Sequence, residues 1–170
     1  MDLESHIRDI PDFPKPGIMF KDITPLLGDP AAFDASITQL AAPYRDGGVD
    51  AVVGIESRGF IFGAAVAREL GVGFVPIRKP GKLPADTISV SYALEYGEDT
   101  VEIHRDAVKK GQRVLLLDDV LATGGTMAAA CELVEKAGAE IAGIAFLVEL
   151  SFLEGKGKLD GYDIFSVLTY

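Results

Sequence analysis

The stretch from residue 114 to residue 134 limits the possible folds of this chain more than any other part of the sequence. Residues 114–117 are four branched apolar side chains, and such a short run is typical of a strand buried on both faces in the parallel sheet of an α/β domain. Asp118 and Asp119 follow directly, then small residues at positions 122–126, and then good helix formers at positions 127–134. This stretch predicts a strand, an acidic pair, a tight loop and a helix, in that order.

A junction of this kind favours an anionic ligand. The first N–H groups of a helix have no intrahelical partner and lie at the positive end of the helix dipole, so they stabilise an anion. Gly124 and Gly125 let the backbone approach that anion closely, and Thr123 and Thr126 offer hydroxyl donors. The acidic pair stands at the carboxyl end of the strand, where ligands of open α/β sheets bind. A sugar phosphate fits, with its phosphate at the loop and its hydroxyls or a metal ion at the acids.

The same residues have a simpler interpretation, an ordinary strand-to-helix turn with carboxylates that cap the helix. Two adjacent acids after four apolar residues argue against it, because buried like charges are costly unless a cation or hydroxyls compensate them. The chain has no Gly-x-x-x-x-Gly-Lys-Ser/Thr sequence, and no Gly-x-Gly-x-x-Gly follows a strand. These absences disfavour triphosphate hydrolysis and dinucleotide binding.

Two further loops carry basic residues after predicted strands. Arg58 opens a second strand–loop–helix junction, where it either pairs with a carboxylate such as Glu56 or holds a second anion. A later loop is basic and contains Arg78, Lys79 and Lys82. Charge runs are usually solvated connections, but in a chain with a net charge of −10 this loop can concentrate an anionic ligand.

Residues 87–103 alternate between apolar and polar around a Tyr-Gly turn, which predicts a β hairpin outside the parallel sheet. The hairpin is either an ordinary excursion with Glu95 exposed or a mobile lid. A reaction through a cationic sugar favours the lid, because water must be excluded or the sugar is hydrolysed.

Apolar runs that alternate with helical patterns predict an α/β fold with a parallel sheet, right-handed crossovers and a site at the carboxyl ends of the strands. Four buried strands are predicted, at residues 51–55, 73–77, 113–118 and 141–149. The other expected elements are helices at residues 3–10, 30–41 and 104–110, a short anchoring strand at 18–23 and a last strand at 161–168.

The composition predicts one cytoplasmic domain without nucleic-acid or membrane partners. A length of 170 residues suits a single core. The apolar runs are far below membrane-spanning length, and the first residues lack the basic and apolar regions of a signal peptide. The acidic balance argues against binding to duplex nucleic acid. The single cysteine, Cys131, excludes an intrachain disulfide and a cysteine-rich metal site.

At these motifs the chain resembles the type I phosphoribosyltransferases. Residues 114–126 match the signature with which that family binds phosphoribosyl pyrophosphate (PRPP), an apolar run followed by Asp-Asp and Ala-Thr-Gly-Gly-Thr. Residues 13–27, Phe-Pro-x-Pro-Gly-Ile-x-Phe-Lys-Asp-Ile-x-Pro-Leu-Leu, are similar to the opening of adenine phosphoribosyltransferases. Residues 91–97, Ser-Tyr-x-Leu-Glu-Tyr-Gly, are similar to their lid.

The resemblance implies one domain over residues 1–170 with the type I phosphoribosyltransferase fold, a central parallel sheet flanked by helices. A small N-terminal hood at about residues 1–30 and a β flap at about residues 80–106 would cover the site. The implied reaction transfers the phosphoribosyl group of PRPP to adenine and gives AMP and pyrophosphate, a step of purine salvage. Magnesium is the implied cofactor, and a homodimer is the implied working form.

The resemblance also implies roles for individual residues. The implied adenine-binding residues are Met19, Phe20, Lys21 and Val120, with Glu95 as the base near the purine. The implied pyrophosphate-binding residues are Arg58, Lys79 and Lys82, with Arg78 reaching the neighbouring subunit's site. The implied ribose ligands, and through water the magnesium ligands, are Asp118 and Asp119. The implied 5′-phosphate loop is Ala122, Thr123, Gly124, Gly125 and Thr126.

Three alternatives stay open at this point. The first is a phosphoribosyltransferase for another base, such as xanthine or orotate. The second is a non-catalytic PRPP-sensing regulator, which would need a nucleic-acid surface or an added DNA-binding domain. The third is a phosphorelay receiver, whose acidic pair should lie on its first strand, with a separate phosphoacceptor aspartate on a later one.

Overall fold

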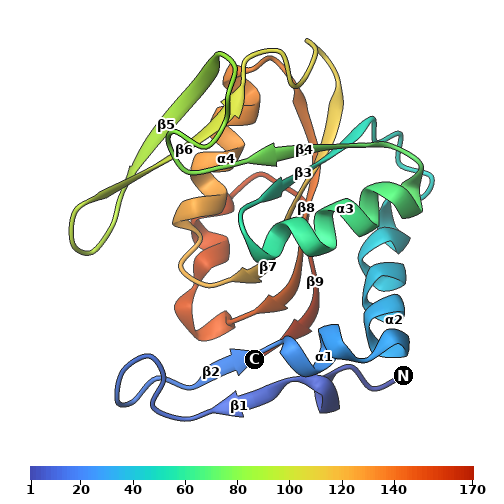
Figure 1. Ribbon diagram of the computed structural model, residues 1–170, viewed down its shortest axis with the longest axis vertical. Coiled ribbons are helices and arrows are strands. Elements are labelled where there is room, and N and C mark those ends of the chain that lie inside the picture. The colour runs from blue at the N-terminus through green and yellow to red at the C-terminus, as the bar shows by residue number, and fades with distance from the viewer.

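A five-stranded, all-parallel sheet forms the centre of the computed structural model, which describes residues 1–170 (Figure 1). The strand order is β4-β3-β7-β8-β9. The strands are β3 (Ala51–Ile55), β4 (Gly73–Ile77), β7 (Arg113–Leu121), β8 (Glu140–Glu149) and β9 (Ile164–Thr169). The predicted α/β fold with a parallel sheet is confirmed, although β9 begins at Ile164 rather than at residue 161.

The central strand β7 is buried on both faces, as its apolar run predicts. Val114, Leu115, Leu116 and Leu117 are all fully buried. Because successive side chains of a strand point to opposite faces, Val114 and Leu116 join one hydrophobic core and Leu115 and Leu117 join the other. A shift of one residue would exchange the two sets, so packing fixes the position of everything that follows on this strand.

Helices cover both faces of the sheet (Figure 1). On one face, α2 (Pro30–Ala41) and α3 (Arg58–Leu70) pack their apolar sides into the core that contains Leu115. On the other face lies α4 (Gly125–Lys136), whose Leu133 and Val134 are fully buried. The Asp29 side chain caps α2 by accepting hydrogen bonds from the N–H groups of its first turn, a common way to satisfy the unpaired donors there.

The N-terminal segment differs from its prediction. Residues 3–10 are not one helix but a 3₁₀ turn, η1 (Glu4–His6), followed by β1 (Arg8–Ile10). This strand pairs antiparallel with β2 (Phe20–Asp22), so the predicted strand at 18–23 belongs to a separate ribbon and does not anchor the central sheet. Short isolated helices are marginal in water, and pairing with β2 gives the backbone of residues 8–10 partners on a neighbouring strand instead. The short α1 (Thr24–Gly28) then leads into α2.

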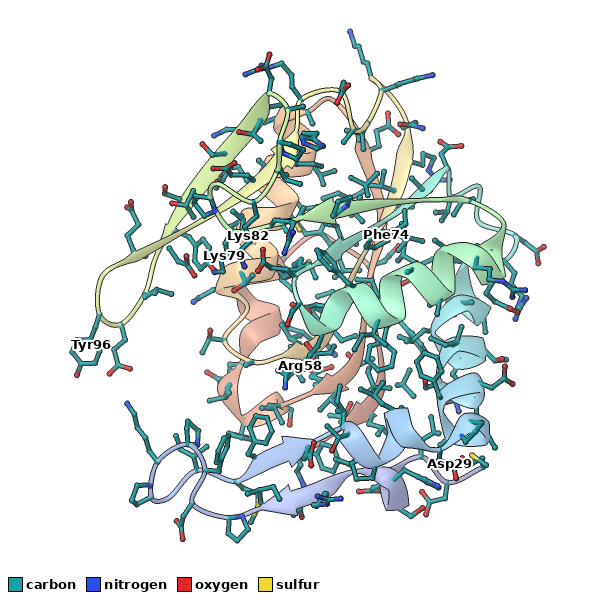
Figure 2. The ribbon with its side chains drawn as sticks, in the orientation of Figure 1. Asp29, Arg58, Phe74, Lys79, Lys82 and Tyr96 are labelled. Carbon is teal, nitrogen blue, oxygen red and sulfur yellow. The ribbon has the colours of Figure 1, made fainter.

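The predicted hairpin is confirmed as β5 (Thr87–Ala93) paired antiparallel with β6 (Glu98–His104). Its base lies over α4, where Val90, Val101 and Ile103 are buried in the core. Its tip projects from the molecule, and Tyr96 at the tip is 85% exposed (Figure 2). The predicted helix at residues 104–110 is wrong, because His104 still belongs to β6 and the residues after it form turns and bends. No helix of the chain combines the length and the apolar character needed to cross a bilayer.

The ring of Phe74 on β4, labelled in Figure 2, packs against two glycines, one on β3 and one on α3. A Cβ placed on Gly54 of β3 would lie 2.6 Å from Cε2 of Phe74, and one on Gly63 of α3 would lie 2.8 Å from the same atom. The ring therefore occupies the space that side chains at these two positions would need.

We expect Gly54→Ala to lower the free energy of unfolding by about 1–3 kcal/mol, because the added methyl group overpacks a filled core. Urea unfolding measures the change. Gly73→Ala is the matched control, since a Cβ on Gly73 meets nothing within 4 Å. Equal stabilities of the two variants would contradict the packing account.

Candidate active site

A cleft of about 610 Å³ opens at the carboxyl ends of β3, β4 and β7, beside the β1–β2 ribbon. Sequence positions that are far apart line it. Of the predicted site residues, the cleft is lined by Met19, Phe20, Lys21, Arg58, Lys79, Asp118, Asp119, Val120, Ala122 and Thr126. A small adjoining cavity of about 90 Å³ is lined by the remaining loop residues, Thr123, Gly124 and Gly125. Together the two cavities bring most of the predicted site to one edge of the sheet, as a parallel sheet requires.

The glycine-rich loop runs from the end of β7 into α4. Gly124 precedes the helix with φ of 82°, in the left-handed region that favours glycine. A Cβ on Gly124 would collide with the carbonyl oxygen of Gly155, and a Cβ on Gly155 would collide with the carbonyl oxygen of Ala122. The loop is therefore held in shape by the 3₁₀ turn η4 (Gly155–Leu159), and its conformation leaves the first N–H groups of α4 free for an anion.

The acidic pair lies inside β7 rather than after it, because the strand continues to Leu121. Asp118 Oδ1 accepts the N–H of Asp119 at 2.9 Å. A Cβ on Gly59 would lie 2.7 Å from the same oxygen, so the first turn of α3 packs directly on this carboxyl group. Burial, together with the neighbouring Asp119 carboxylate, raises the pKa of Asp118 well above its ordinary value.

Arg58, labelled in Figure 2, forms an ion pair with Asp119 in the cleft. Nε of Arg58 lies 2.7 Å from Oδ2 of Asp119, but its N–H bond is not directed at this oxygen well enough to form a hydrogen bond. The buried Oδ2 therefore has no hydrogen-bond donor. Arg58 begins α3, next to the predicted loop. Of its two predicted fates, pairing with a carboxylate is the one found in this structure, and a ligand that supplies a donor to Oδ2 would satisfy an otherwise orphaned atom.

The basic residues of the loop after β4 all contact the carboxylate of Glu56. The sequence suggested this residue only as a partner for Arg58. Glu56 Oε1 accepts the N–H of Lys79 at 2.7 Å and lies 3.3 Å from Nε of Arg78, and Oε2 lies 2.9 Å from Nζ of Lys82. Burial alone would raise the pKa of Glu56, but these donors outweigh it and lower the pKa below its ordinary value. Lys79 lines the cleft, whereas Arg78 and Lys82 are turned to Glu56 and do not.

The hairpin connects the basic loop to the glycine-rich loop through residues that the sequence did not single out. Asp99 of β6 forms an ion pair with Lys79 and accepts a hydrogen bond from the Tyr92 hydroxyl at 3.2 Å. The same hydroxyl lies 3.0 Å from Oγ1 of Thr126. Burial alone would lower the pKa of Lys79, but Asp99 and Tyr92 outweigh it and raise the pKa.

The β1–β2 ribbon supplies an aromatic wall. The Phe20 ring packs edge-on against Phe13, with centroids 5.1 Å apart, and lies 5.8 Å from the guanidinium carbon of Arg58. The Lys21 ammonium turns away to Asp9 at 2.6 Å and lies over the Tyr170 ring. Lys21 therefore presents its backbone to the cleft, and Phe20 presents a ring face flanked by a cation.

Glu95, the predicted base, lies at the exposed tip of the hairpin between β5 and β6. It does not line the cleft. Its neighbour Tyr96 marks this tip in Figure 2, well away from Arg58 and Lys79. In this conformation the structure does not bring Glu95 together with the other predicted residues.

Comparison with known proteins identifies the family of the chain. A family model described as the phosphoribosyl transferase domain matches residues 26–167. An adenine phosphoribosyltransferase of Kosmotoga olearia is 59% identical over 170 residues, the whole of both chains. The chain belongs to the adenine phosphoribosyltransferases. It is thus a pentosyltransferase, which sets aside the receiver and the non-catalytic regulator.

Solved structures of adenine phosphoribosyltransferases share the fold over the whole chain. The enzyme of Thermoanaerobacter pseudethanolicus superposes with a TM-score of 0.96 at 56% identity and covers 99% of this chain and 98% of its own. The Giardia lamblia enzyme complexed with 9-deazaadenine has a TM-score of 0.93 at 46% identity, with 99% and 96% covered. The Trypanosoma brucei enzyme in complex with AMP, pyrophosphate and ribose-5-phosphate has a TM-score of 0.89 at 27% identity, with 98% and 78% covered.

We expect Asp118→Asn to make the protein more stable at pH 7. The raised pKa means that the folded state binds the Asp118 proton more tightly than the unfolded state, so wild-type stability falls as the pH rises above the unfolded pKa of about 3.9. Asparagine carries no such penalty and keeps an oxygen to accept the N–H of Asp119.

Urea unfolding at a series of pH values measures this gain. It should be largest near neutral pH and shrink as the pH falls toward 4. An asparagine variant that is less stable than wild type at pH 7, or a difference that does not vary with pH, would contradict the electrostatic description of the acidic pair.

Proposed function

We propose that this chain catalyses the transfer of the phosphoribosyl group of PRPP to adenine, with AMP and pyrophosphate as products. The observation that carries the proposal is one cleft lined by a glycine-rich helix start, two adjacent acids, two basic side chains and an aromatic wall. A phosphorylated pentose that bears a pyrophosphate matches the first three features, and a planar base matches the last. The names of the relatives and the ligands of the solved structures support the same substrates.

The glycine-rich loop holds the 5′-phosphate in this proposal. N–H groups at the start of α4 and the hydroxyls of Thr123 and Thr126 donate to it. Asp118 and Asp119 orient the ribose, and the orphaned Oδ2 of Asp119 accepts a ribose hydroxyl. As the bond from C1 to pyrophosphate stretches, positive charge develops on the ribose, and the negative charge of the acidic pair favours it.

The pyrophosphate is held by Arg58, Lys79 and Lys82, and each of these cations has a carboxylate partner in the free chain. Binding is therefore an exchange of anions rather than the capture of free cations. The exchange lowers the barrier only insofar as the three side chains fit the departing pyrophosphate better than they fit bound PRPP.

Magnesium fits this site as a cation held mainly by the substrate. The chain has no group of three or more His, Cys, Asp or Glu side chains that could hold a metal ion by themselves. Asp118 and Asp119 are hard oxygen donors, and Mg²⁺ commonly combines one or two carboxylates with water and substrate phosphates. When bound, the ion would neutralise charge on the pyrophosphate. The chain's own residues then orient the ribose and exclude water.

Adenine stacks on Phe20, with backbone groups of Met19 and Lys21 at its edge and Val120 at its other side. Hydrogen-bonding groups arranged for the amino group at the purine 6-position would be left unpaired, or would be repelled, by an oxo group there. Hypoxanthine and guanine are therefore disfavoured. Glu95 serves as the base for the purine proton. Because it lies at the hairpin tip, this role requires the flap to fold over the cleft during the reaction.

The proposed working form is a homodimer in the cytoplasm. Arg78 directly follows β4, and Glu56 holds it in the single chain. In the dimer it would leave Glu56 and reach the neighbouring subunit's site. Light scattering of the purified protein tests the dimer.

Incubation of the purified protein with adenine, PRPP and magnesium tests the reaction, and we expect AMP and pyrophosphate in equal amounts. Asp118→Asn combined with Asp119→Asn should cut turnover severely while circular dichroism shows an intact fold. Competition with hypoxanthine decides the base. Strong turnover of hypoxanthine would refute the preference for adenine.

We expect Asp99→Asn to lower the KM for PRPP, because it removes the internal anion that competes for Lys79. An ion pair near the surface is worth up to about 1 kcal/mol, so the decrease should be about fivefold. Steady-state kinetics with PRPP as the varied substrate measures it. Glu98→Gln is the matched control, since it removes one negative charge from the same strand without a Lys79 contact. A KM that rises in Asp99→Asn would show that Asp99 assists PRPP binding instead.

A further inference from the structure

We infer that Lys158, on the turn η4, is a further ligand of the 5′-phosphate of PRPP. The inference rests on the proposed function, since it takes the anion at the glycine-rich loop to be that phosphate. Neither the sequence pattern nor the resemblance assigns any role to this lysine, which lies more than thirty residues after the loop in the chain.

The backbone of η4 is fixed against the loop at its beginning and anchored in the core at its end. Gly155 lies so close to the loop that a Cβ on it would collide with the Ala122 carbonyl oxygen and approach Cδ1 of Leu121 to 3.0 Å. Leu159 is 1% exposed and belongs to the core that contains α4. Lys158 stands between these two anchors, so its Cα has a defined position relative to the loop.

The ammonium of Lys158 lies at the start of α4. Its Nζ is 3.8 Å from the position that a Cβ would take on Gly125, the first residue of that helix. A cation near a helix N-terminus is repelled by the positive end of the helix dipole. In the free chain this placement is therefore unfavourable, and an anion between the ammonium and the helix start reverses the sign of the interaction.

Lys158 also lacks an ion pair in a chain that has 26 acidic and 16 basic residues. The cations at the pyrophosphate end of the cleft each have a carboxylate partner. Lys156, two residues earlier on the same turn, lies 2.8 Å from Oε2 of the buried Glu149. No such partner lies within 4.0 Å of Nζ of Lys158, so this ammonium can bind an external anion without losing an internal one.

A lysine in this place contributes binding rather than chemistry. The 5′-phosphate is carried unchanged from PRPP to AMP, so a contact with it stabilises substrate, transition state and product alike. We expect Lys158→Gln to raise the KM for PRPP about tenfold with little change in kcat, which is typical of the loss of uniform binding. Lys158→Arg, which keeps the charge, should restore most of the affinity.

Calorimetry with three ligands separates this role from a structural one. Ribose 5-phosphate and AMP carry the 5′-phosphate, whereas inorganic pyrophosphate binds at the other end of the cleft. We expect Lys158→Gln to weaken the first two about tenfold and to leave pyrophosphate unchanged. Lys156→Gln is the matched control, with the same change of charge on the same turn, and it should bind all three ligands as wild type does.

Three results would overturn the inference. They are wild-type affinity of Lys158→Gln for ribose 5-phosphate, an equal loss of affinity for pyrophosphate, and an equal loss in Lys156→Gln. The proposed function fails separately, because it requires the wild-type protein to make AMP and to bind ribose 5-phosphate. Thermal melting of each variant confirms that it is folded before its affinity is interpreted.

Discussion

The burial of β7 on both faces is the constraint on which the rest of the structure depends. Val114 to Leu117 divide alternately between two cores, so the strand can neither slide nor turn without exposing apolar side chains. This fixes where the acids stand, because they continue the same strand. It also fixes where α4 begins, because the glycine-rich loop leaves from the same strand end. The N-terminus of α3 reaches the same edge, where Gly59 packs on Asp118.

Charge in and beside the cleft is arranged as ion pairs. Asp119 holds Arg58, Asp99 holds Lys79 and Glu56 holds Lys82. A protein with a net charge of −10 thereby keeps cations at this edge of the sheet, and in the proposed function the pyrophosphate would replace their carboxylate partners. The cost of this arrangement falls on Asp118, whose raised pKa reports the burial of one carboxyl group beside another. Such unfavourable placements are common where binding or catalysis requires them.

The sequence was informative where structure is local and less so where it depends on distant contacts. The buried strands and the glycine-rich loop follow from runs of neighbouring residues, and they are where the patterns predict them. Residues 3–10 were predicted as a helix because their spacing cannot reveal the returning strand β2. Gly155 likewise shapes the glycine-rich loop through a contact between segments that are far apart in the chain. In the sequence, Gly155 is only a glycine in a basic turn. The position of the Lys158 ammonium beside the start of α4 depends on the same kind of distant contact.

The most direct measurement of the central claim is a crystal structure of the protein with PRPP and magnesium. The account predicts the 5′-phosphate within hydrogen-bonding distance of the N–H groups at the start of α4, with the ribose hydroxyls over Asp118 and Asp119. A PRPP molecule whose 5′-phosphate faces solvent, or whose ribose lies away from the acidic pair, would contradict it.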